Sequence, residues 1–356
     1  MRSEPRFHFH VFTCRDPDTD FRRPLAEALS AFGATTYIWL KRRPIVYDPV
    51  SADEPREMTL SAFLALMARR RSDGAIPVYL NSTNTYFPGL TIALRMMAPA
   101  GVWCFDLHDD LRYHNTGLKR ITQDLIVRMI AAVSHEIVHA APTLRELFPR
   151  SRHLGNASHL HRVRHNAARS DAVLVVASFD ERLDVPFLEA VIRRNPDLSF
   201  HLHGWVRSDD DATRAALDAL IRACPNATYH GPYSMADLPS ILAGYKVTLA
   251  PYRTGTTLTH FIDPLRFYHC LNAGVEVVST PIPQAQAMSR WISLVTNVDT
   301  CSETLRAILL DRLGKQADYT PITWGQKAAR FLEILRDSPR TPVLAARYQA
   351  GFGGAD

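Results

Sequence analysis

The chain has 356 residues, of which 46% are hydrophobic and 22% charged, and this composition excludes a disordered chain. Its formal net charge is +5, but Lys and Arg are dispersed and form no nucleic-acid-binding motif, so we expect a phosphorylated metabolite or an anionic membrane surface as partner, not nucleic acid. Five scattered cysteines without CxxC spacing argue against a disulfide framework and a zinc site. No apolar run approaches the ~18 residues of a membrane span, and the first residues do not resemble a secretory signal, so a cytoplasmic protein is expected.

The first half of the chain alternates between strand and helix patterns. In chain order, a strand is expected at 7–12, a helix at 21–33, a strand at 35–40, a helix at 59–71, strands at 76–80 and 102–107, and a helix at 118–133. Strands that are separated by helices predict parallel βαβ units and a doubly wound sheet.

The alternation restarts after a polar, basic stretch at 162–171, which we interpret as a linker. Strands are expected at 172–178, 198–206, 227–231, 247–252 and 275–280, and helices at 185–195, 212–224, 235–245 and 264–273. The fold class is therefore α/β, with two Rossmann-like domains in tandem. Ligands of such sheets bind beyond the carboxyl ends of the strands, so we expect a site in a cleft between two facing domains.

A loop rich in threonine, residues 251–263, follows one of the predicted strands of the second half. It contains Arg253, Gly255 and four threonines, Thr256 and Thr257 among them, and it is expected to run directly into the helix that carries Arg266. Hydroxyl groups, free backbone amides and a helix N-terminus together make an anion site that suits a diphosphate. A polar loop whose threonines merely cap the helix is the alternative interpretation.

Acidic side chains follow the last clear strand of the first half, in the sequence FDLHDDLRYHN (105–115). Asp106, His108, Asp109 and Asp110 would stand where a general base or an acceptor-binding residue is needed, and a neighbouring carboxylate raises the pKa of its partner. A divalent-metal site is a second interpretation, which we do not adopt because no other carboxylate cluster completes a metal shell. Asp20 ends a loop after the first strand and would face the same site, although turn chemistry explains it equally well.

Several stretches together resemble the GT-B superfamily of sugar-nucleotide glycosyltransferases. The resemblance is to the bacterial surface-polysaccharide branch, which is related to family 4 and to the xanthan glucuronosyltransferase. It is carried by SFDERLDVPFLEAVIRRNPDLSFHLHGWV (178–206), ATYHGPYSMADLPSILAGYKVTLAPYR (227–253), DPLRFYHCLNAGVEVVSTPIPQ (263–284), HEIVHAAPTLRELFP (135–149) with RHLGNASH (152–159), and TWGQKAARFLEILRD (323–337).

The resemblance implies a GT-B fold with an acceptor-binding domain at 1–161, a nucleotide-sugar-binding domain at 162–320, and a C-terminal helix and tail at 321–356 that fold back towards the first domain. It implies a hexosyl or uronosyl transferase in exopolysaccharide biosynthesis. The donor would be a UDP- or GDP-sugar, and the acceptor a hydroxyl of a polyprenyl-linked lipid or a polysaccharide. No metal would be required. The basic helices of the first half would rest on the inner face of the cell membrane, although solvated helix faces explain their charges equally well.

The resemblance also implies roles for single donor-binding residues. Arg266 matches a lysine that holds the donor diphosphate, and Arg253 with the threonine-rich loop would assist it. His269 stands where most relatives have a glutamate that binds the ribose, and Ser178 stands where a glycine is common.

On the acceptor side, Asp109 matches the proposed catalytic base, and Asp20, Asp106 and His108 would bind the acceptor. Two alternatives remain open. The loss of the glutamate at position 269 is compatible with a non-catalytic protein that binds a nucleotide sugar, and a sugar-nucleotide epimerase uses the same fold.

Overall fold

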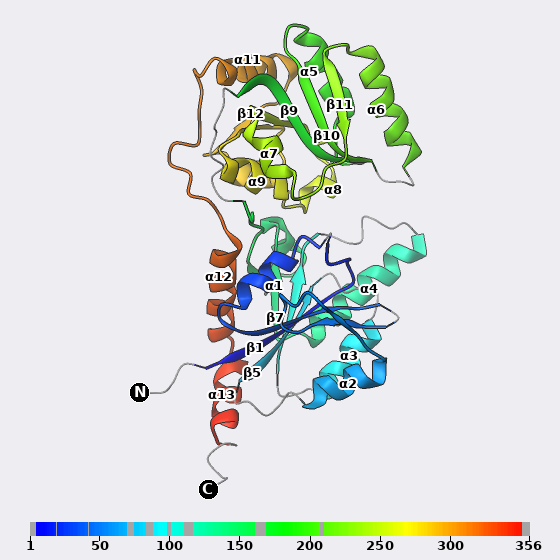
Figure 1. Ribbon diagram of the computed structural model, residues 1–356, viewed down its shortest axis with the longest axis vertical. Coiled ribbons are helices and arrows are strands. Elements are labelled where there is room, and N and C mark those ends of the chain that lie inside the picture. Colours follow the sequence, from blue (N-terminus) through cyan, green and yellow to red (C-terminus); the bar gives the residue numbers. More distant parts are fainter. Residues whose placement is uncertain are drawn as a thin grey trace. The chain divides into compact units, whose positions relative to one another are not determined.

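A computed structural model describes residues 5–18, 20–41, 43–69, 75–82, 88–97, 101–109, 117–160, 169–206 and 210–350 (Figure 1). The chain divides into two compact units. The first comprises Met1–Gly155 together with Trp324–Asp356, and the second comprises Asn156–Thr323. Each unit contains its own sheet and is described separately below. Residues 162–168, most of the linker expected at 162–171, lie outside the described residues.

The first unit contains an eight-stranded sheet in the order β4-β3-β2-β1-β5-β6-β7-β8 within the described residues. The strands are β1 (Phe7–Thr13), β2 (Gly33–Trp39), β3 (Ile45–Tyr47), β4 (Arg56–Glu57), β5 (Ile76–Ser82), β6 (Val102–Leu107), β7 (Glu136–His139) and β8 (Arg152–His153). Strands β3 and β4 pair antiparallel at one edge, and all the others pair parallel. The order of the parallel strands reverses between β1 and β5, so the switch point of this sheet lies at their carboxyl ends.

Helices cover both faces of the first sheet. They are α1 (Arg23–Leu29), α2 (Leu60–Arg69), α3 (Pro88–Met97), α4 (Gly117–Val133), α12 (Trp324–Arg336) and α13 (Arg340–Ala350), together with a 3₁₀ helix at Pro142–Glu146. Helices α2 and α3 pack on one face, where Phe63 and Leu94 join Phe12, Tyr79 and Trp103 in one apolar cluster. Helix α12 from the end of the chain packs against α1 near the start (Figure 1).

The second unit contains a six-stranded parallel sheet in the order β11-β10-β9-β12-β13-β14. The strands are β9 (Ser170–Phe179), β10 (Phe200–Val206), β11 (Ala227–Gly231), β12 (Tyr245–Ala250), β13 (Glu276–Ser279) and β14 (Ile292–Leu294). In chain order this is the 3-2-1-4-5-6 arrangement of a dinucleotide-binding fold, and its switch point lies between β9 and β12.

The side chains of β9 alternate between two apolar clusters. Val173 and Val175 point to the face covered by α5, α6 and α11, whereas Leu174 and Val176 point to the face covered by α7, α9 and α10. The helices of this unit are α5 (Val185–Arg194), α6 (Asp211–Ala223), α7 (Leu238–Ala243), α8 (Thr257–His260), α9 (Leu265–Ala273), α10 (Pro283–Ala287) and α11 (Val298–Leu309). Because both faces are covered, the strand is a continuous apolar run, as expected for a parallel sheet.

Most of the expected elements are confirmed, but several short ones were not anticipated. The hairpin strands β3 and β4 and the helix α3 have no counterpart in the expected list. The interpretation of residues 102–107 as the last clear strand of the first half is wrong, because β7 follows it and all four of its residues are buried. No helix in the described part of the chain is long and apolar enough to cross a membrane.

Candidate functional site

The switch point of the second sheet brings together residues from the ends of β9 and β12. Ser178 is exposed at the end of β9, and Asp180 follows it in the loop. Tyr252 and Arg253 follow β12, where Tyr252 forms an isolated bridge with Leu183. This is the edge at which a doubly wound sheet binds its ligand.

Arg266 lies at the start of α9 and points its guanidinium at this edge. Its Cζ lies 4.6 Å from the centre of the Tyr252 ring, which is a cation–π contact. Its Nη1 is buried and has no hydrogen-bond partner among the described residues. A buried cationic donor without a partner is costly, so this nitrogen is suited to an anionic ligand.

An ion pair next to Arg266 was not anticipated from the sequence. Asp180 is 8% exposed and accepts hydrogen bonds from the backbone amide of Arg182, at 3.0 Å, and from its guanidinium. Burial alone would raise the pKa of Asp180, but the hydrogen bonds and charge of Arg182, with the charge of Arg266, lower it. Asp180 is therefore an anion whose oxygens are engaged by Arg182, and Arg266 makes no ion pair within the described residues.

The threonine-rich loop forms its own short helix. Thr256 is the N-cap of α8, a helix of four residues, and its hydroxyl accepts a hydrogen bond from the amide of Thr259. The hydroxyl of Thr259 in turn donates to the carbonyl of Arg253 at 2.6 Å. The expectation that the loop runs directly into the helix of Arg266 is wrong, because α8 and residues 261–264 intervene. Thr257 is exposed in the first turn of α8.

Arg253 is exposed, and its backbone holds it beside the loop after β9. Its amide donates to the carbonyl of Arg182 at 2.9 Å, and its Nε donates to the carbonyl of Leu183 at 3.2 Å. Its terminal amino groups make no hydrogen bond with the described residues.

Two aromatic rings at the same edge were also missed from the sequence. The rings of Trp205, near the end of β10, and Tyr233, after β11, have centroids 4.4 Å apart. Trp205 is 41% exposed. Burial raises the pKa of Tyr233 and the charge of Arg266 opposes the rise, so Tyr233 lies within the field of that guanidinium.

His269 contacts different neighbours from Arg266, although both are on α9. It is 8% exposed, its Nδ1 lies 2.7 Å from the hydroxyl oxygen of Ser158, and its ring packs edge-on against His159. Burial, with a smaller contribution from the charge of His159, lowers the pKa of His269 to about 3. The imidazole is therefore neutral and is held by the segment that enters the second unit. Its role towards a nucleotide stays a prediction.

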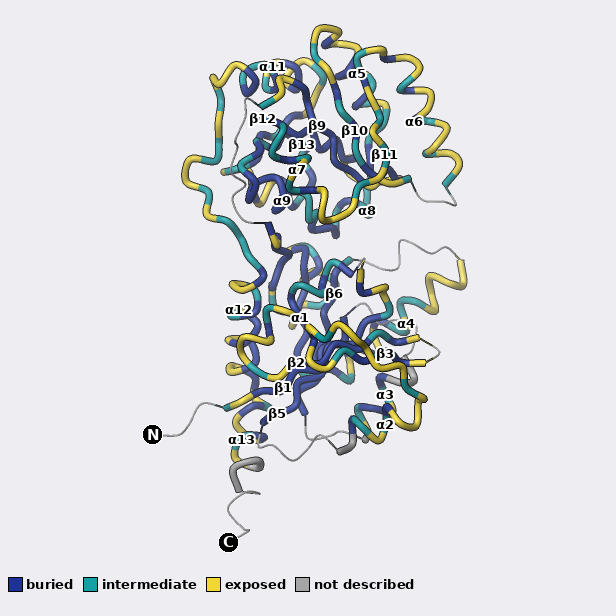
Figure 2. The backbone as a smooth tube through the Cα atoms, in the orientation of Figure 1, coloured by how far each residue is buried: buried dark blue, intermediate teal, exposed yellow. Residues whose placement is uncertain are grey.

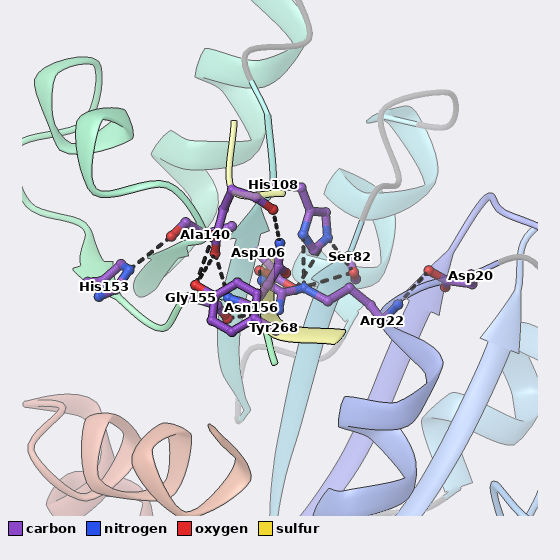
Figure 3. A network of polar contacts seen from close by, with 11 residues as sticks. Asp20, Arg22, Ser82, Asp106, His108, Ala140, His153, Gly155, Asn156 and Tyr268 are labelled. Atoms are coloured by element: carbon purple, nitrogen blue, oxygen red, sulfur yellow. Dashed lines mark hydrogen bonds and ion pairs between the residues drawn. The ribbon is translucent and has the colours of Figure 1, made fainter. Parts of the chain in front are cut away.

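In the first unit, a buried arginine holds the acidic cluster (Figure 3). Arg22 is 1% exposed, and its guanidinium donates to Asp106 Oδ1 at 2.9 Å, to His108 Nδ1 at 2.9 Å and to the carbonyl of Gly155 at 3.1 Å. It also lies over the ring of Trp324. Arg22 thus links the start of α1, the end of β6 and the C-terminal helix α12 of the same unit. The sequence offered no signal for it beyond the pattern FRRPL.

The hydrogen bonds around Arg22 define the protonation of the cluster. Because Arg22 donates to His108 Nδ1, the ring proton is on Nε2, which faces the hydroxyl of Ser82 at 2.9 Å, and Ser82 donates to Asp106 Oδ2 at 3.3 Å. Burial and the charges of Arg22 and Arg15 lower the pKa of His108 well below its usual value. Burial raises the pKa of Asp106, and Arg22 opposes the rise. The main cause of this raised pKa is therefore burial, not the neighbouring carboxylate expected from the sequence.

The other acidic residues of the first unit differ in their partners. Asp20 is buried, and its carboxylate accepts hydrogen bonds from the Arg22 amide at 3.0 Å and the Tyr37 hydroxyl at 2.6 Å. Asp109 follows β6, is partly exposed and makes no hydrogen bond or ion pair with the described residues. Asp110 lies outside the described residues. In the described part of the chain, no group of three or more His, Cys, Asp or Glu side chains could hold a metal ion.

Comparison with known proteins identifies the fold. No protein-family model and no curated protein matches the chain. Solved structures that resemble it include sucrose-phosphate synthase from Thermosynechococcus elongatus (14% identity, TM-score 0.62, 98% of this chain and 100% of that chain), and HepE from Anabaena with UDP and glucose (12%, 0.60, 92% and 99%). The UDP-GlcNAc 2-epimerase of Methanocaldococcus jannaschii is also similar (12%, 0.51, 93% and 99%).

These identities are low, and the likeness extends over nearly the whole of each chain. The protein has the α/β fold with parallel sheets of the GT-B glycosyltransferases, as expected.

Proposed function

We propose that this protein is a glycosyltransferase that moves a sugar from a nucleotide diphosphate to a hydroxyl of a lipid-linked or polysaccharide acceptor. The observation that carries the proposal is the guanidinium of Arg266, whose Nη1 is buried at the switch point of the second sheet and has no hydrogen-bond partner within the described residues. A guanidinium can hold two phosphate oxygens at once, and this is the position at which such sheets bind the phosphates of their ligands.

Other residues of the same edge complete a donor site. Arg253 is expected to assist with its terminal amino groups, which make no hydrogen bond with the described residues, and Ser178 and Thr257 are exposed. The ring pair of Trp205 and Tyr233 offers a surface for the nucleobase, and stacking of a base on an aromatic ring contributes about 1–3 kcal/mol. UDP or GDP is the expected nucleotide.

In the proposed reaction, the carboxylate of Asp109 takes the proton of the acceptor hydroxyl as the oxygen attacks the anomeric carbon of the donor sugar. The bond from that carbon to the diphosphate oxygen breaks, and Arg266 stabilises the negative charge on the departing diphosphate. Among the described acidic residues of the cluster, Asp109 makes no hydrogen bond or ion pair with another described residue. Asp106, His108 and Asp20 are engaged by Arg22 or Tyr37, and they would shape the acceptor site around Asp109.

Nucleotide binding tests the donor site. Thermal unfolding is measured with UDP, GDP and their common sugars, and a ligand at 100 times its dissociation constant stabilises the folded protein by about 2.7 kcal/mol. We expect one nucleotide to stabilise the native protein and to lose most of its effect in Arg266→Met. Arg193→Met is the matched control, because Arg193 is an exposed arginine of the same unit that pairs with Glu189. The absence of a response to any nucleotide would contradict the assignment.

The catalytic base is tested separately with Asp109→Asn. This variant should keep nucleotide binding and lose sugar transfer, whereas Asp53→Asn, which changes an exposed carboxylate of the same unit, should keep both. Equal transfer by Asp109→Asn would exclude Asp109 as the base. A native protein that binds the nucleotide sugar but never transfers the sugar would be a binding protein instead.

An epimerase is the second candidate, because the Methanocaldococcus jannaschii enzyme has a similar fold. Incubation of the donor sugar nucleotide without acceptor distinguishes the two. An epimerase would yield an altered sugar or free UDP in this reaction, whereas a transferase would leave most of the donor intact.

A further inference from the structure

Three arginines of the first unit lie around the side chain of His135. Arg95 is in the last turn of α3, Arg150 follows the 3₁₀ helix, and Arg340 begins α13. The Nη2 atom of Arg95 lies 2.9 Å from His135 Nε2. Burial and the charges of all three arginines lower the pKa of His135 to about 4, so the imidazole is neutral. Three positive charges therefore act on one uncharged ring.

The hydrogen bonds of His135 leave one donor facing another. The backbone amide of Trp103 donates to His135 Nδ1 at 3.0 Å, so the proton of the neutral ring is on Nε2. This N–H group faces the N–H groups of Arg95, because a guanidinium has no acceptor. The other tautomer would only move the conflict to the Trp103 amide. His108 differs in this respect, because its Nε2 faces the hydroxyl of Ser82.

The guanidinium groups of Arg95 and Arg150 are only partly used by the protein. Arg95 Nε donates to the carbonyl of Val133 at 3.3 Å, and Arg150 Nη2 donates to the carbonyl of Ser134 at 3.2 Å. Both arginines therefore cap the C-terminal end of α4, where cations are favoured. Arg95 Nη1 and the Nε and Nη1 of Arg150 make no hydrogen bond with the described residues, so these donors remain for a ligand.

Carboxylates do not balance the charge of these two arginines. Neither Arg95 nor Arg150 forms an ion pair within the described residues, and the adjacent carboxylate of Glu136 lies 3.7 Å from Arg152 instead. A like charge acts on Arg95, because burial and the charge of Arg340 lower its pKa. Cations that are held together in this way repel one another, and an anion bound between them would relieve the repulsion.

The cluster lies at the amino-terminal edge of the first sheet. Strand β6 begins at Val102, and β7 begins at Glu136, directly after His135. Strand β6 is buried along its whole length (Figure 2), and its six residues span about 20 Å, so the cluster is far from the switch point at the carboxyl ends of the strands. Arg150 is exposed, and Arg95 and His135 are half-buried, so a ligand can reach them from solvent.

We propose that the three arginines and the Nε2–H group of His135 bind the phosphate group of a small soluble ligand, either inorganic phosphate or a phosphate ester. A phosphate oxygen that accepts from both Arg95 Nη2 and His135 Nε2 removes the conflict between these two donors. Guanidinium groups bind phosphate bidentately, and a phosphate ester carries a charge of about −1.5 to −2 at pH 7, which opposes the three cations. The ligand joins α3, α13 and the end of α4. This inference does not depend on the transferase activity.

Titration with inorganic phosphate at constant ionic strength tests the proposal on the full-length protein. Hydrogen exchange is measured on peptides from residues 91–97 and 129–135, which contain the two helix ends beside the cluster. We expect phosphate to slow exchange in these peptides of the native protein, and the effect to saturate. Glycerol 3-phosphate is the second probe, and the tighter binder of the two identifies the source of the phosphate group.

Variants locate the binding site. Arg95→Gln with Arg150→Gln should weaken phosphate binding at least tenfold. Arg128→Gln is the matched control, because Arg128 is an exposed arginine of α4 that pairs with Asp124, and it should leave the affinity unchanged. Circular dichroism verifies that the double variant is folded. If the loss of the caps of α4 unfolds it, Arg340→Gln replaces it and should weaken phosphate binding several-fold.

Three results would overturn the proposal. If neither phosphate compound gives a saturating response in the native protein, the cluster is not a phosphate site. Equal affinity of the native protein and the double variant, or of the native protein and Arg340→Gln, would place the phosphate elsewhere. Loss of the response in Arg266→Met would assign it to the second unit, whereas the proposal expects Arg266→Met to respond like the native protein.

Discussion

The buried imidazole of His269 should make the second unit sensitive to acid. The hydroxyl of Ser158 accepts a hydrogen bond from the amide of Leu160 at 2.9 Å, so its own proton is directed at His269 Nδ1. The imidazole is neutral in the folded protein. Protonation would both remove this acceptor and bury a charge. Burial, with a smaller contribution from the charge of His159, is the cause of the low pKa of His269.

The magnitude follows from the two pKa values. The pKa is about 3 when the protein is folded and 6.5 when it is unfolded. Between these values the unfolded chain binds more protons than the native one, so stability falls as the pH falls below 6.5 and is fully retained above it. Between pH 8 and pH 5, His269 alone should reduce the free energy of unfolding by about 2 kcal/mol.

The comparison with His269→Asn isolates this effect from the other histidines. Asparagine keeps an acceptor for Ser158 but does not titrate. Hydrogen exchange in increasing urea, measured at pH 8 and pH 5 on peptides from residues 170–206, reports the stability of the second unit separately. The native protein should lose about 2 kcal/mol more than the variant on acidification.

Two results would refute the reasoning. If both proteins lose the same free energy of unfolding, His269 titrates normally and is not buried as a neutral group. If the native protein instead becomes more stable at pH 5, the imidazole gains an anionic partner on protonation.

Three further predictions concern the free energy of unfolding in urea. Arg22→Met leaves the buried carboxylate of Asp106 without its ion-pair partner and should lower the free energy of unfolding by about 3–5 kcal/mol. Adding Asp106→Asn should restore part of this loss, and no recovery would contradict the pairing. Asp210→Ala removes the N-cap of α6, whose carboxylate accepts from the Thr213 amide, and should cost about 1 kcal/mol; a neutral result would mean that the cap is not formed. Gly274→Ala places a side chain at φ 76° and should cost about 1–2 kcal/mol, and an unchanged stability would contradict this backbone conformation.

The parallel sheets were predictable because their strands are continuous apolar runs separated by amphipathic helices. Residues 172–178 could hardly be anything but a buried strand, and the structure extends it to Ser170–Phe179. Strand β7 was missed because its four residues, EIVH, are too few to show a hydrophobic periodicity. The boundary at Gly274 was predictable because glycine readily adopts the left-handed conformation that ends α9.

The candidate site was only partly predictable. Arg266 was singled out because it lies on the helix after the threonine-rich loop and because it matches a known motif. Its buried Nη1, which has no hydrogen-bond partner among the described residues, is a separate observation. The sequence could not identify Arg22 as a residue of the site, because its partners Asp106 and His108 lie 84 and 86 residues further along the chain. Asp180 and Arg182 are only two residues apart, but a local acid–base pair in a loop usually signals an exposed turn, not a buried ion pair.

The return of Trp324–Asp356 to the first unit has a consequence for synthesis on the ribosome. The second unit is one uninterrupted segment and can fold as soon as residue 323 has emerged, because domains generally fold as units. The first unit cannot complete its folding at that stage. Its packing requires α12, because Trp324 of this helix lies over the buried guanidinium of Arg22. We therefore expect the second unit of the nascent chain to fold before the first unit. Arg22 and Asp106 would be exposed to water until α12 and α13 have emerged.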